Sequence, residues 1–478
     1  MPYPTPIPPK VPIANNEEYN RISENKFKEV VSSPLSTFST DVDTASYANV
    51  RRFLNDQQAS LPPKNAVRIE ELINYFSYDY KVPQNEDPFY INTHVGNSIW
   101  NNDTKIIEIA LQTKKPNITK LPASNLVFLL DVSGSMGNAK KLPLLKKSLK
   151  LLVKQLRAKD SVSIVVYAGS SGLVLDKARG DQEEKIIEAL NKLNAGGSTA
   201  GGAGIRLAYK VAKEAFIENG NNRVILATDG DFNVGQSSQE ALVKLIKEKR
   251  EDDIFLTVLG FGMGNYKDGR MEQLADKGNG NYAYIDNLLE AKKVLVTQMN
   301  GTLHTVAKDV KVQVEFNPNS IHAYRLIGYE NRTLANKDFN DDKKDAAEIG
   351  MGHSVTALYE VVLASKEVKS EVDSLKYQRS TANSNELATV KIRYKKPTAN
   401  VSTKMQKIIH HSDADINQKD FNFAQTVAGF GMLLRDSEYK NSLTFEQLIE
   451  LAKDSKNEDR EGYRAEFIKM MEKAQLLK

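Results

Sequence analysis

The sequence contains no cysteine, which excludes disulfide bridges, zinc sites with cysteine ligands, iron–sulfur clusters and thiol nucleophiles. It also lacks long apolar runs. The longest resemble residues 126–130, far below the roughly 20 residues of a membrane-spanning helix, so we expect no transmembrane segment. Neither sign of charge is in large excess, because the chain has 65 Lys and Arg residues and 61 Asp and Glu residues. Nucleic acid is therefore not expected as a partner.

Length and composition predict several folded domains. Apolar residues make up 40% and charged residues 26% of the 478 positions, values typical of globular proteins that bury a core. At about 150 residues per domain, the chain has room for about three such units.

The chain begins with MPYPTPIPPKVP, a proline-rich stretch that favours extended polyproline II structure. This stretch lacks the basic and then apolar order of a signal peptide. We interpret residues 1–30 as a linker. A linker in this place predicts that a signal, an anchor or a further domain precedes residue 1.

Residues 31–120 form a predicted N-terminal module of helices and strands. Asp43 or Thr44 can cap a helix that runs to Leu54, because both side chains accept hydrogen bonds from the first N–H groups of a helix. The remaining predicted elements are a helix at about 65–76 and strands at about 89–95 and 105–113.

Residues 121–303 show the pattern of a doubly wound α/β domain. Short apolar strands alternate with helices whose apolar residues recur every three to four positions, such as Leu142, Leu145 and Leu149. Strands of this kind are buried on both faces, which predicts a mostly parallel sheet covered by helices on each side. The predicted strands are 126–131, 162–168, 173–176, 224–228, 254–259 and 282–285.

Residues 304–410 form a predicted β-rich C-terminal module, and residues 411–478 are predicted to be helical. A two-stranded hairpin alone is only marginally stable. We therefore predict that the strands within 89–113 pair in one sheet with strands after 304, so that the α/β domain is inserted into a β-rich domain. The predicted elements are strands at 310–316, 324–328, 354–363 and 387–394, and helices at 421–434, 445–452 and 463–477.

Oxygen-bearing side chains follow the strands of the α/β domain. Asp131, Ser133 and Ser135 lie on a tight loop after the first strand, Thr199 lies in a glycine-rich loop, and Asp229 follows the fourth strand. Open α/β sheets bind ligands outside the carboxyl ends of their strands, where these residues are expected to meet. Carboxylate and hydroxyl oxygens are hard donors, which suit Mg²⁺ better than zinc or copper.

The pattern D-x-S-x-S, a distant Thr and T-D-G resembles the metal-ion-dependent adhesion site of von Willebrand factor type A domains, and all five positions match. The resemblance implies that Ser133, Ser135 and sometimes Thr199 bind Mg²⁺, Mn²⁺ or Ca²⁺ directly. It implies that Asp131 and Asp229 act largely through water. It also implies that one coordination position remains for an acidic group of the ligand.

Segments outside this domain extend the resemblance to a family of bacterial von Willebrand factor type A proteins with flanking modules. They include PLSTFSTDVDTASY at 34–47, YRLIGYENRTL at 324–334 and GHSVTALYE at 352–360. Members of that family are commonly exported, often as lipoproteins, and few have a defined activity. The resemblance thus implies an extracytoplasmic place in the cell envelope, with a lipid anchor upstream of residue 1.

Other motifs favour ordinary structural roles. The glycines of Gly260-Phe-Gly262-Met-Gly264 do not complete a dinucleotide fingerprint, so we interpret them as a strand-to-loop turn. The glycine-rich loop before Gly204 lacks the Lys of a phosphate-binding loop, and no G-x-S-x-G elbow occurs. The acidic run from Asp338 to Glu348 lacks the spacing of an EF-hand. We do not interpret His410-His411 as a metal site, because neighbouring residues on a strand face opposite ways. Trp100 is interpreted as a packing residue.

The sequence predicts a non-enzymatic adhesion protein that captures a carboxylate of a protein or glycan ligand at a Mg²⁺ centre. The alternative is a partner of an AAA+ ATPase in complex assembly or metal insertion, which uses the same type of domain. A metallohydrolase is a third hypothesis, weakened because no His or Lys is paired with Asp131 and Asp229 as a general base. The gene region upstream of residue 1 separates the first two, since an export signal favours adhesion and a neighbouring ATPase favours the alternative.

Overall fold

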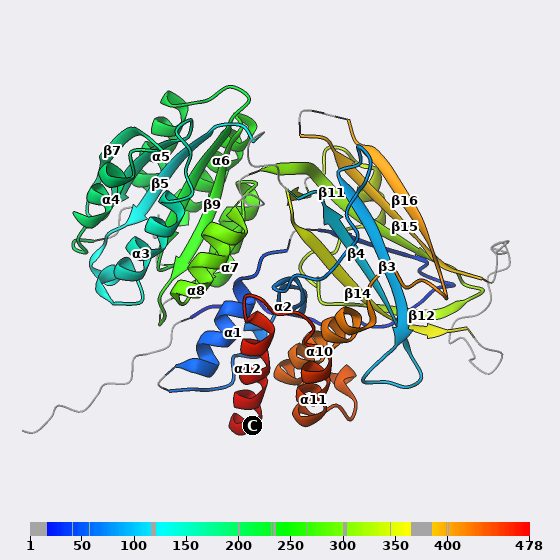
Figure 1. The fold of residues 1–478 in the computed structure, drawn as a ribbon. Coiled ribbons are helices and arrows are strands. Elements are labelled where there is room, and N and C mark those ends of the chain that lie inside the picture. The colour runs from blue at the N-terminus through cyan, green and yellow to red at the C-terminus, as the bar shows by residue number, and fades with distance from the viewer. Residues whose placement is uncertain are drawn as a thin grey trace, which may run out of the picture.

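The computed structural model shows an α/β domain beside a two-sheet β module, with helices packed below both (Figure 1). It describes residues 17–478 except 41, 57, 116–120, 199–200, 231, 233–235, 265, 300–303, 345, 365–384, 398 and 400. Thr199, Asp345 and most of the predicted linker therefore lie outside the described residues. Within the described part of the chain, no helix is both long and apolar enough to cross a membrane.

The α/β domain contains a six-stranded sheet in the order β10-β9-β8-β5-β6-β7. Strands β5, β6, β8, β9 and β10 run parallel, and β7 is an antiparallel edge strand. This arrangement confirms the doubly wound, mostly parallel sheet predicted from the apolar strands. The strands are β5 Ser124–Asp131, β6 Ser161–Tyr167, β7 Ser171–Arg179, β8 Asn221–Thr228, β9 Ile254–Phe261 and β10 Tyr282–Ile285.

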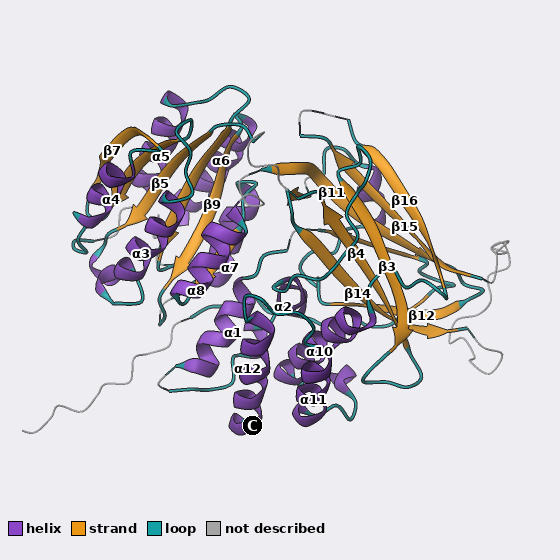
Figure 2. Cartoon of the chain, viewed as in Figure 1, coloured by secondary structure: helices purple, strands orange, loops and turns teal. Residues whose placement is uncertain are grey.

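Helices cover both faces of this sheet (Figure 2). Two separate apolar clusters result, one with α3, α4 and α8 and the other with α5, α6 and α7. The second cluster also includes Ala45 and Ala48 of α1, a helix of the N-terminal region. The helices are α3 Leu142–Val153, α4 Glu183–Asn191, α5 Gly201–Glu214, α6 Gln236–Glu251, α7 Asp268–Lys277 and α8 Leu288–Lys292.

The β module packs two antiparallel sheets face to face around one apolar cluster. One sheet has the order β1-β12-β14-β4-β3, and the other has the order β13-β11-β15-β16, with β2 paired to β11. The strands are β1 Lys28–Glu29, β2 Leu35–Ser39, β3 Phe89–Asn97, β4 Lys105–Thr113, β11 Thr305–Phe316, β12 Ile321–Ile327, β13 Ala347–Gly350, β14 Ser354–Leu363, β15 Glu386–Lys395 and β16 Thr403–His410.

Segments before and after the α/β domain share one sheet, which confirms that this domain is inserted. Strand β4 precedes the α/β domain and pairs with β14, which follows it, in an eight-residue ladder from Lys105↔Val361 to Gln112↔Ser354. Strand β3 extends the same sheet through β4. The insertion therefore enters and leaves the β module without breaking its sheet.

The helices below the sheets share a fourth apolar cluster with the outer face of β4 and β14. On β4, Ile106 and Ala110 face this helical core, whereas the intervening Ile107 and Ile109 face the interior of the two sheets. Trp100 is 4% exposed and packs in the same core, as predicted. The helices are α1 Ala45–Asn55, α2 Ile69–Asn74, α10 Gln418–Arg435, α11 Phe445–Ser455 and α12 Tyr463–Leu477.

Two local predictions are wrong. The helix expected at 65–76 is a short 3₁₀ turn, Lys64–Ala66, followed by α2, because Val67 and Arg68 adopt extended backbone between them. The Asp43 and Thr44 side chains make no cap for α1. Asp43 accepts the backbone N–H of Tyr282 at 2.8 Å instead.

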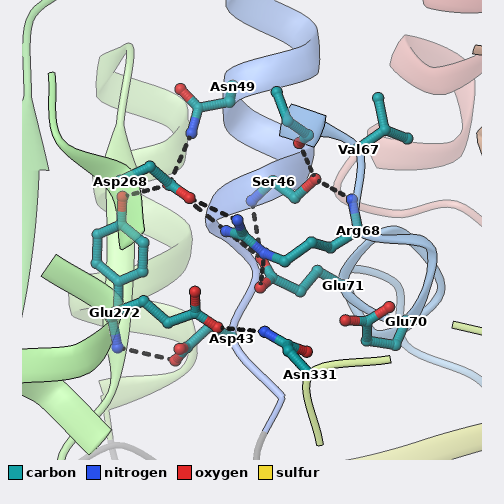
Figure 3. A network of polar contacts seen from close by, with 12 residues as sticks. Asp43, Ser46, Asn49, Val67, Arg68, Glu70, Glu71, Asp268, Glu272 and Asn331 are labelled. Atoms are coloured by element: carbon teal, nitrogen blue, oxygen red, sulfur yellow. Dashed lines mark hydrogen bonds and ion pairs between the residues drawn. The ribbon is translucent and has the colours of Figure 1, made fainter. Parts of the chain in front are cut away.

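Buried charges join the inserted domain to helices α1 and α2 (Figure 3). Arg68 donates to Glu71 of α2 and, at 2.5 Å, to Asp268 of α7. Asp268 also accepts hydrogen bonds from Tyr282 at 2.8 Å and from Asn49 at 3.3 Å. Glu71 in turn accepts the N–H of residue 46 at the start of α1, at 2.8 Å. The α/β domain and these helices are therefore held together by polar contacts as well as apolar packing.

A second buried arginine, on helix α1, makes a similar connection to the inserted domain. Arg51 of α1, 1% exposed, forms ion pairs with Asp286 at 2.5 Å and Glu290 at 2.7 Å, both in the α/β domain. It also pairs with Glu466 of α12 at 2.9 Å. Helix α1 is thereby fixed between the inserted domain and the C-terminal helices.

Glu108 of β4 makes the free energy of unfolding depend on pH. This side chain is fully buried, and burial raises its pKa to about 8, although Tyr80 donates a hydrogen bond to it at 2.7 Å. Between the unfolded value of 4.5 and about 8, the folded protein keeps a proton that the unfolded chain has lost. Raising the pH through this window therefore lowers the free energy of unfolding, by up to about 1.4 kcal/mol per pH unit.

Glu108→Gln is expected to make this decline smaller, because glutamine cannot ionise. Part of the decline should remain, since burial raises the pKa of Glu70 to about 7. Urea denaturation at pH 6 and pH 8 measures it, with Glu214→Gln on the surface of α5 as the control. If Glu108→Gln loses as much stability between the two pH values as the wild type, the assignment is wrong.

Candidate metal centre

Two parallel strands bring the predicted carboxylates to one edge of the α/β sheet. Strands β5 and β8 are neighbours, and Leu130 pairs with Ala227 one residue before β8 ends. Asp131 is the last residue of β5, and Asp229 directly follows β8. Both side chains therefore lie at the carboxyl edge of the sheet, where α/β folds place their sites.

Asp131 is fully buried and held from three directions. Its Oδ1 accepts the backbone N–H of Ser133 at 2.9 Å, and its Oδ2 accepts the hydroxyls of Tyr167 at 3.1 Å and Thr228 at 3.2 Å. Burial raises the pKa of Asp131, the hydrogen bonds from Ser133 and Tyr167 oppose this rise, and nearby Asp229 adds to it. The carboxylate thus has a fixed orientation and lies next to a like charge.

The two serine hydroxyls meet in the loop that follows. Ser133 Oγ lies 3.0 Å from Ser135 Oγ; Ser133 is 2% exposed and Ser135 faces solvent. The glycine-rich loop is hydrogen-bonded to this turn, because Gly196 donates to the Val132 carbonyl at 2.8 Å and Gly134 donates to the Gly197 carbonyl at 3.0 Å. The loop that carries Thr199 is thus held against the serines, although Thr199 itself lies outside the described residues.

Asp229 completes the cluster of described residues and has a cationic neighbour. Its side chain is 4% exposed, and its Oδ2 accepts from the ammonium of Lys141 at 2.7 Å. Lys141 immediately precedes α3, the helix that follows the serine loop. The structure thus brings together four of the five predicted residues and adds a lysine to them. The expectation that no Lys is paired with these carboxylates is therefore wrong, because Lys141 pairs with Asp229.

The donor set fits a hard divalent cation. Asp131, Ser133, Ser135 and Asp229 offer carboxylate and hydroxyl oxygens with no nitrogen or sulfur, the ligand type that Mg²⁺ prefers. Across the described residues, no group of three or more His, Cys, Asp and Glu side chains is placed to hold a metal. A centre at the sheet edge would therefore depend on its serine hydroxyls.

The other motifs have structural roles where they are described. Strand β9 ends at Phe261, and Gly262 and Gly264 turn the chain with φ of +81° and +95°. His410 ends strand β16, and its ring lies 3.4 Å from the carbonyl of Asn385, just before β15. His411 lies in the turn that follows, so the two histidines are not both on the strand as predicted. In the acidic run, Asp342 pairs with Arg393 at 3.2 Å. These interpretations need no bound ion or nucleotide.

Sequence reasoning missed three polar neighbours of the centre, namely Tyr167, Thr228 and Lys141. Thr228 belongs to the T-D-G motif, so its position was visible but its hydrogen bond to Asp131 was not. Tyr167 ends β6, on the other side of β5, and its contact depends on the order of strands in the sheet. Lys141 follows Lys140, and the sequence does not distinguish which of the two turns inward.

Family models match three parts of the chain. The von Willebrand factor type A domain matches residues 125–298, a von Willebrand factor model matches residues 13–108, and the C-terminal model of the uncharacterized protein YfbK matches residues 301–477. Together these matches cover the α/β domain, the N-terminal region and the region after the insertion.

Individual proteins show the same likeness. Uncharacterized protein YfbK of Escherichia coli strain K12 is 44% identical over 470 residues, which are 95% of this chain and 80% of that protein. Inter-alpha-trypsin inhibitor heavy chain H3 of Pongo abelii is 25% identical over 267 residues, 51% of this chain and 29% of that protein. A solved von Willebrand factor type A structure from Catenulispora acidiphila aligns with 83% of this chain and 91% of its own, with 14% identity and a TM-score of 0.43.

Proposed function

Because this chain belongs to the family of the Escherichia coli protein YfbK and contains a von Willebrand factor type A domain, we propose that it is a Mg²⁺-dependent binding protein. Domains of this type generally mediate binding and adhesion. The proposed ligand is a protein or glycan that presents a carboxylate to the cation. The cation is held by Ser133 and Ser135, and by Asp131 and Asp229 through water.

The observation that carries this proposal is the convergence of these four side chains at one sheet edge. The serine hydroxyls are 3.0 Å apart, and the glycine-rich loop is hydrogen-bonded to the turn between them. The solvent-facing Ser135 leaves an approach for a ligand, whereas Asp131 is fully buried. A cation held here has few protein charges around it, which leaves a place for an anionic ligand.

The surroundings of Asp131 favour binding over catalysis. Burial raises the pKa of the Tyr167 phenol well above its ordinary value, so this side chain stays protonated and donates to Asp131. Such hydroxyls orient the carboxylate, and they do not supply the group with a pKa near neutrality that general acid–base catalysis needs. The protein is therefore proposed to be non-enzymatic.

Calorimetry with Mg²⁺ and Mn²⁺ tests the centre directly. We expect one site with modest affinity, because two hydroxyls and two carboxylates provide little negative charge. Ser133→Ala should weaken binding, and Ser163→Ala within the same sheet should not. Tight zinc binding, or the absence of any divalent binding, would contradict the proposal.

Ligand capture tests the second half of the proposal. Immobilised protein is exposed to envelope fractions of the native cell in Mg²⁺ and in EDTA, and Ser133→Ala serves as the matched control. Capture that is lost in EDTA and in the variant supports a metal-dependent ligand.

The proposed site of action is the cell envelope, outside the cytoplasm. Fractionation of cells that carry the full native gene with a C-terminal tag tests this location. Recovery of the protein in the cytosol alone would contradict it.

A further inference from the structure

Lys141 contacts Asp229, one of the carboxylates that a bound cation would also attract. Its ammonium is 2.7 Å from Asp229 Oδ2, and the two side chains are only 15% and 4% exposed. The neighbouring Lys140 is 50% exposed and reaches away to Asp56 at 3.6 Å. Of the two consecutive lysines, only Lys141 therefore contributes its charge to the candidate metal centre.

The fold holds this lysine in place. The backbone N–H of Lys141 donates to the Asn138 carbonyl at 2.9 Å, which fixes the start of the side chain. Its aliphatic stem crosses Gly262, where a Cβ atom would lie 2.7 Å from Lys141 Cγ. Gly262 has φ of +81°, and Tyr284 donates a hydrogen bond to its carbonyl. The ammonium thus reaches Asp229 along a path that any larger residue at position 262 would obstruct.

The charges at this edge have two consequences. The ammonium lies against one of the two carboxylates that would neutralise a divalent cation, so the lysine and the cation repel each other. With a divalent cation in place, Asp131, Asp229, Lys141 and the cation together carry one positive charge. A ligand carboxylate supplies the single negative charge that balances them.

We propose that Lys141 is an internal counter-ion that competes with the divalent cation for Asp229 and so lowers the affinity of the centre for metal. This inference rests on the proposed function, because it concerns the same centre. It adds a residue outside the five predicted positions and assigns a role to its charge.

The test uses the full chain and Mg²⁺ or Mn²⁺ alone as the probe. Lys141→Met keeps the length of the stem and removes the charge, and calorimetry should show binding tighter by on the order of tenfold. Lys141→Arg keeps the charge and should bind within about twofold of the wild type. Lys140→Met is the matched control and should leave the affinity unchanged.

Thermal melting in EDTA gives an independent readout. Without the ammonium, the side chain at position 141 no longer offsets the repulsion between Asp229 and the buried Asp131. Lys141→Met should therefore melt below the wild type in EDTA and gain more from saturating Mg²⁺. Equal or weaker metal binding by Lys141→Met, with binding retained in the wild type, would overturn this inference alone. Failure of both proteins to bind any divalent cation would overturn the proposed metal centre and this inference with it.

Discussion

Arg68→Ala is expected to lower the free energy of unfolding by about 3–5 kcal/mol, the cost of removing one partner from a buried ion pair. The Arg68 guanidinium contacts Glu71 and Asp268, whose side chains are 2% and 0% exposed (Figure 3). Its loss leaves these two carboxylates buried without the cation that both contact. Burial already raises the pKa of Glu71, and Arg68 opposes that rise.

Urea denaturation at pH 7 measures this effect, with two comparisons. Arg179→Ala removes the surface pair with Asp181, in which both side chains are more than 40% exposed, and should change stability by less than about 1 kcal/mol. Arg68→Met retains most of the stem and should remain strongly destabilised if charge is the cause. A midpoint for Arg68→Ala equal to that of Arg179→Ala would show that the junction does not depend on this contact.

The junction also shows where sequence patterns stop. Strands and helices of the α/β domain follow from apolar spacing, since each is buried in a regular way. Arg68 and Asp268 are 200 positions apart, and no local pattern relates them. The predicted cap of α1 is wrong for the same reason. Asp43 accepts the backbone N–H of Tyr282, and Glu71 accepts the N–H at the start of the helix instead. Tertiary contacts here replace the local hydrogen bonds that a sequence pattern predicts.

The β module was predicted in outline, and its edges were missed. Strand β16 is largely exposed, and its sequence TKMQKIIH begins with polar residues, so apolar runs do not reveal it. Strand β2, LSTFS, is short and polar in composition, yet it is buried because β11 and the opposite sheet cover it. Elements that are defined by their neighbours, and not by their own apolar pattern, need the tertiary fold to be recognised.

The candidate centre was more predictable because most of it is local. Asp131, Ser133 and Ser135 lie within five residues, so a single turn brings them together whatever the rest of the fold does. To predict the position of Asp229, it was enough to expect that β8 is parallel to β5 and adjacent to it. Lys141 required the conformation of one side chain over Gly262, which no sequence pattern encodes.

The structure also determines which substitution of Asp131 is informative. Alanine would leave the buried hydroxyls of Tyr167 and Thr228 without their acceptor, at a cost of about 1–3 kcal/mol for an unsatisfied buried group. Asparagine has nearly the same shape and keeps an oxygen for the Ser133 N–H. Its amide nitrogen faces the Tyr167 and Thr228 hydroxyls and can donate to their oxygens, so both hydroxyls keep a polar partner after they lose Asp131 as an acceptor. Loss of function in Asp131→Asn can therefore be assigned to charge and not to a disturbed sheet edge.

Asp131→Asn is expected to weaken Mg²⁺ binding by about 10–100-fold, the usual effect of losing a group that orients the ligands of a metal. Its urea midpoint in EDTA should stay at or above that of the wild type, because the substitution removes a buried charge whose pKa burial already raises and which lies beside Asp229. Calorimetry measures the affinity, and Asp103→Asn in the exposed turn between β3 and β4 is the control, with unchanged binding expected. Metal-dependent ligand capture should fall together with the affinity for Mg²⁺. If Asp131→Asn binds Mg²⁺ as tightly as the wild type does, binding of the cation does not depend on this carboxylate. If the variant loses Mg²⁺ binding but still captures the ligand, the ligand binds elsewhere on the chain. The modules around the α/β domain then become the candidates for the ligand site.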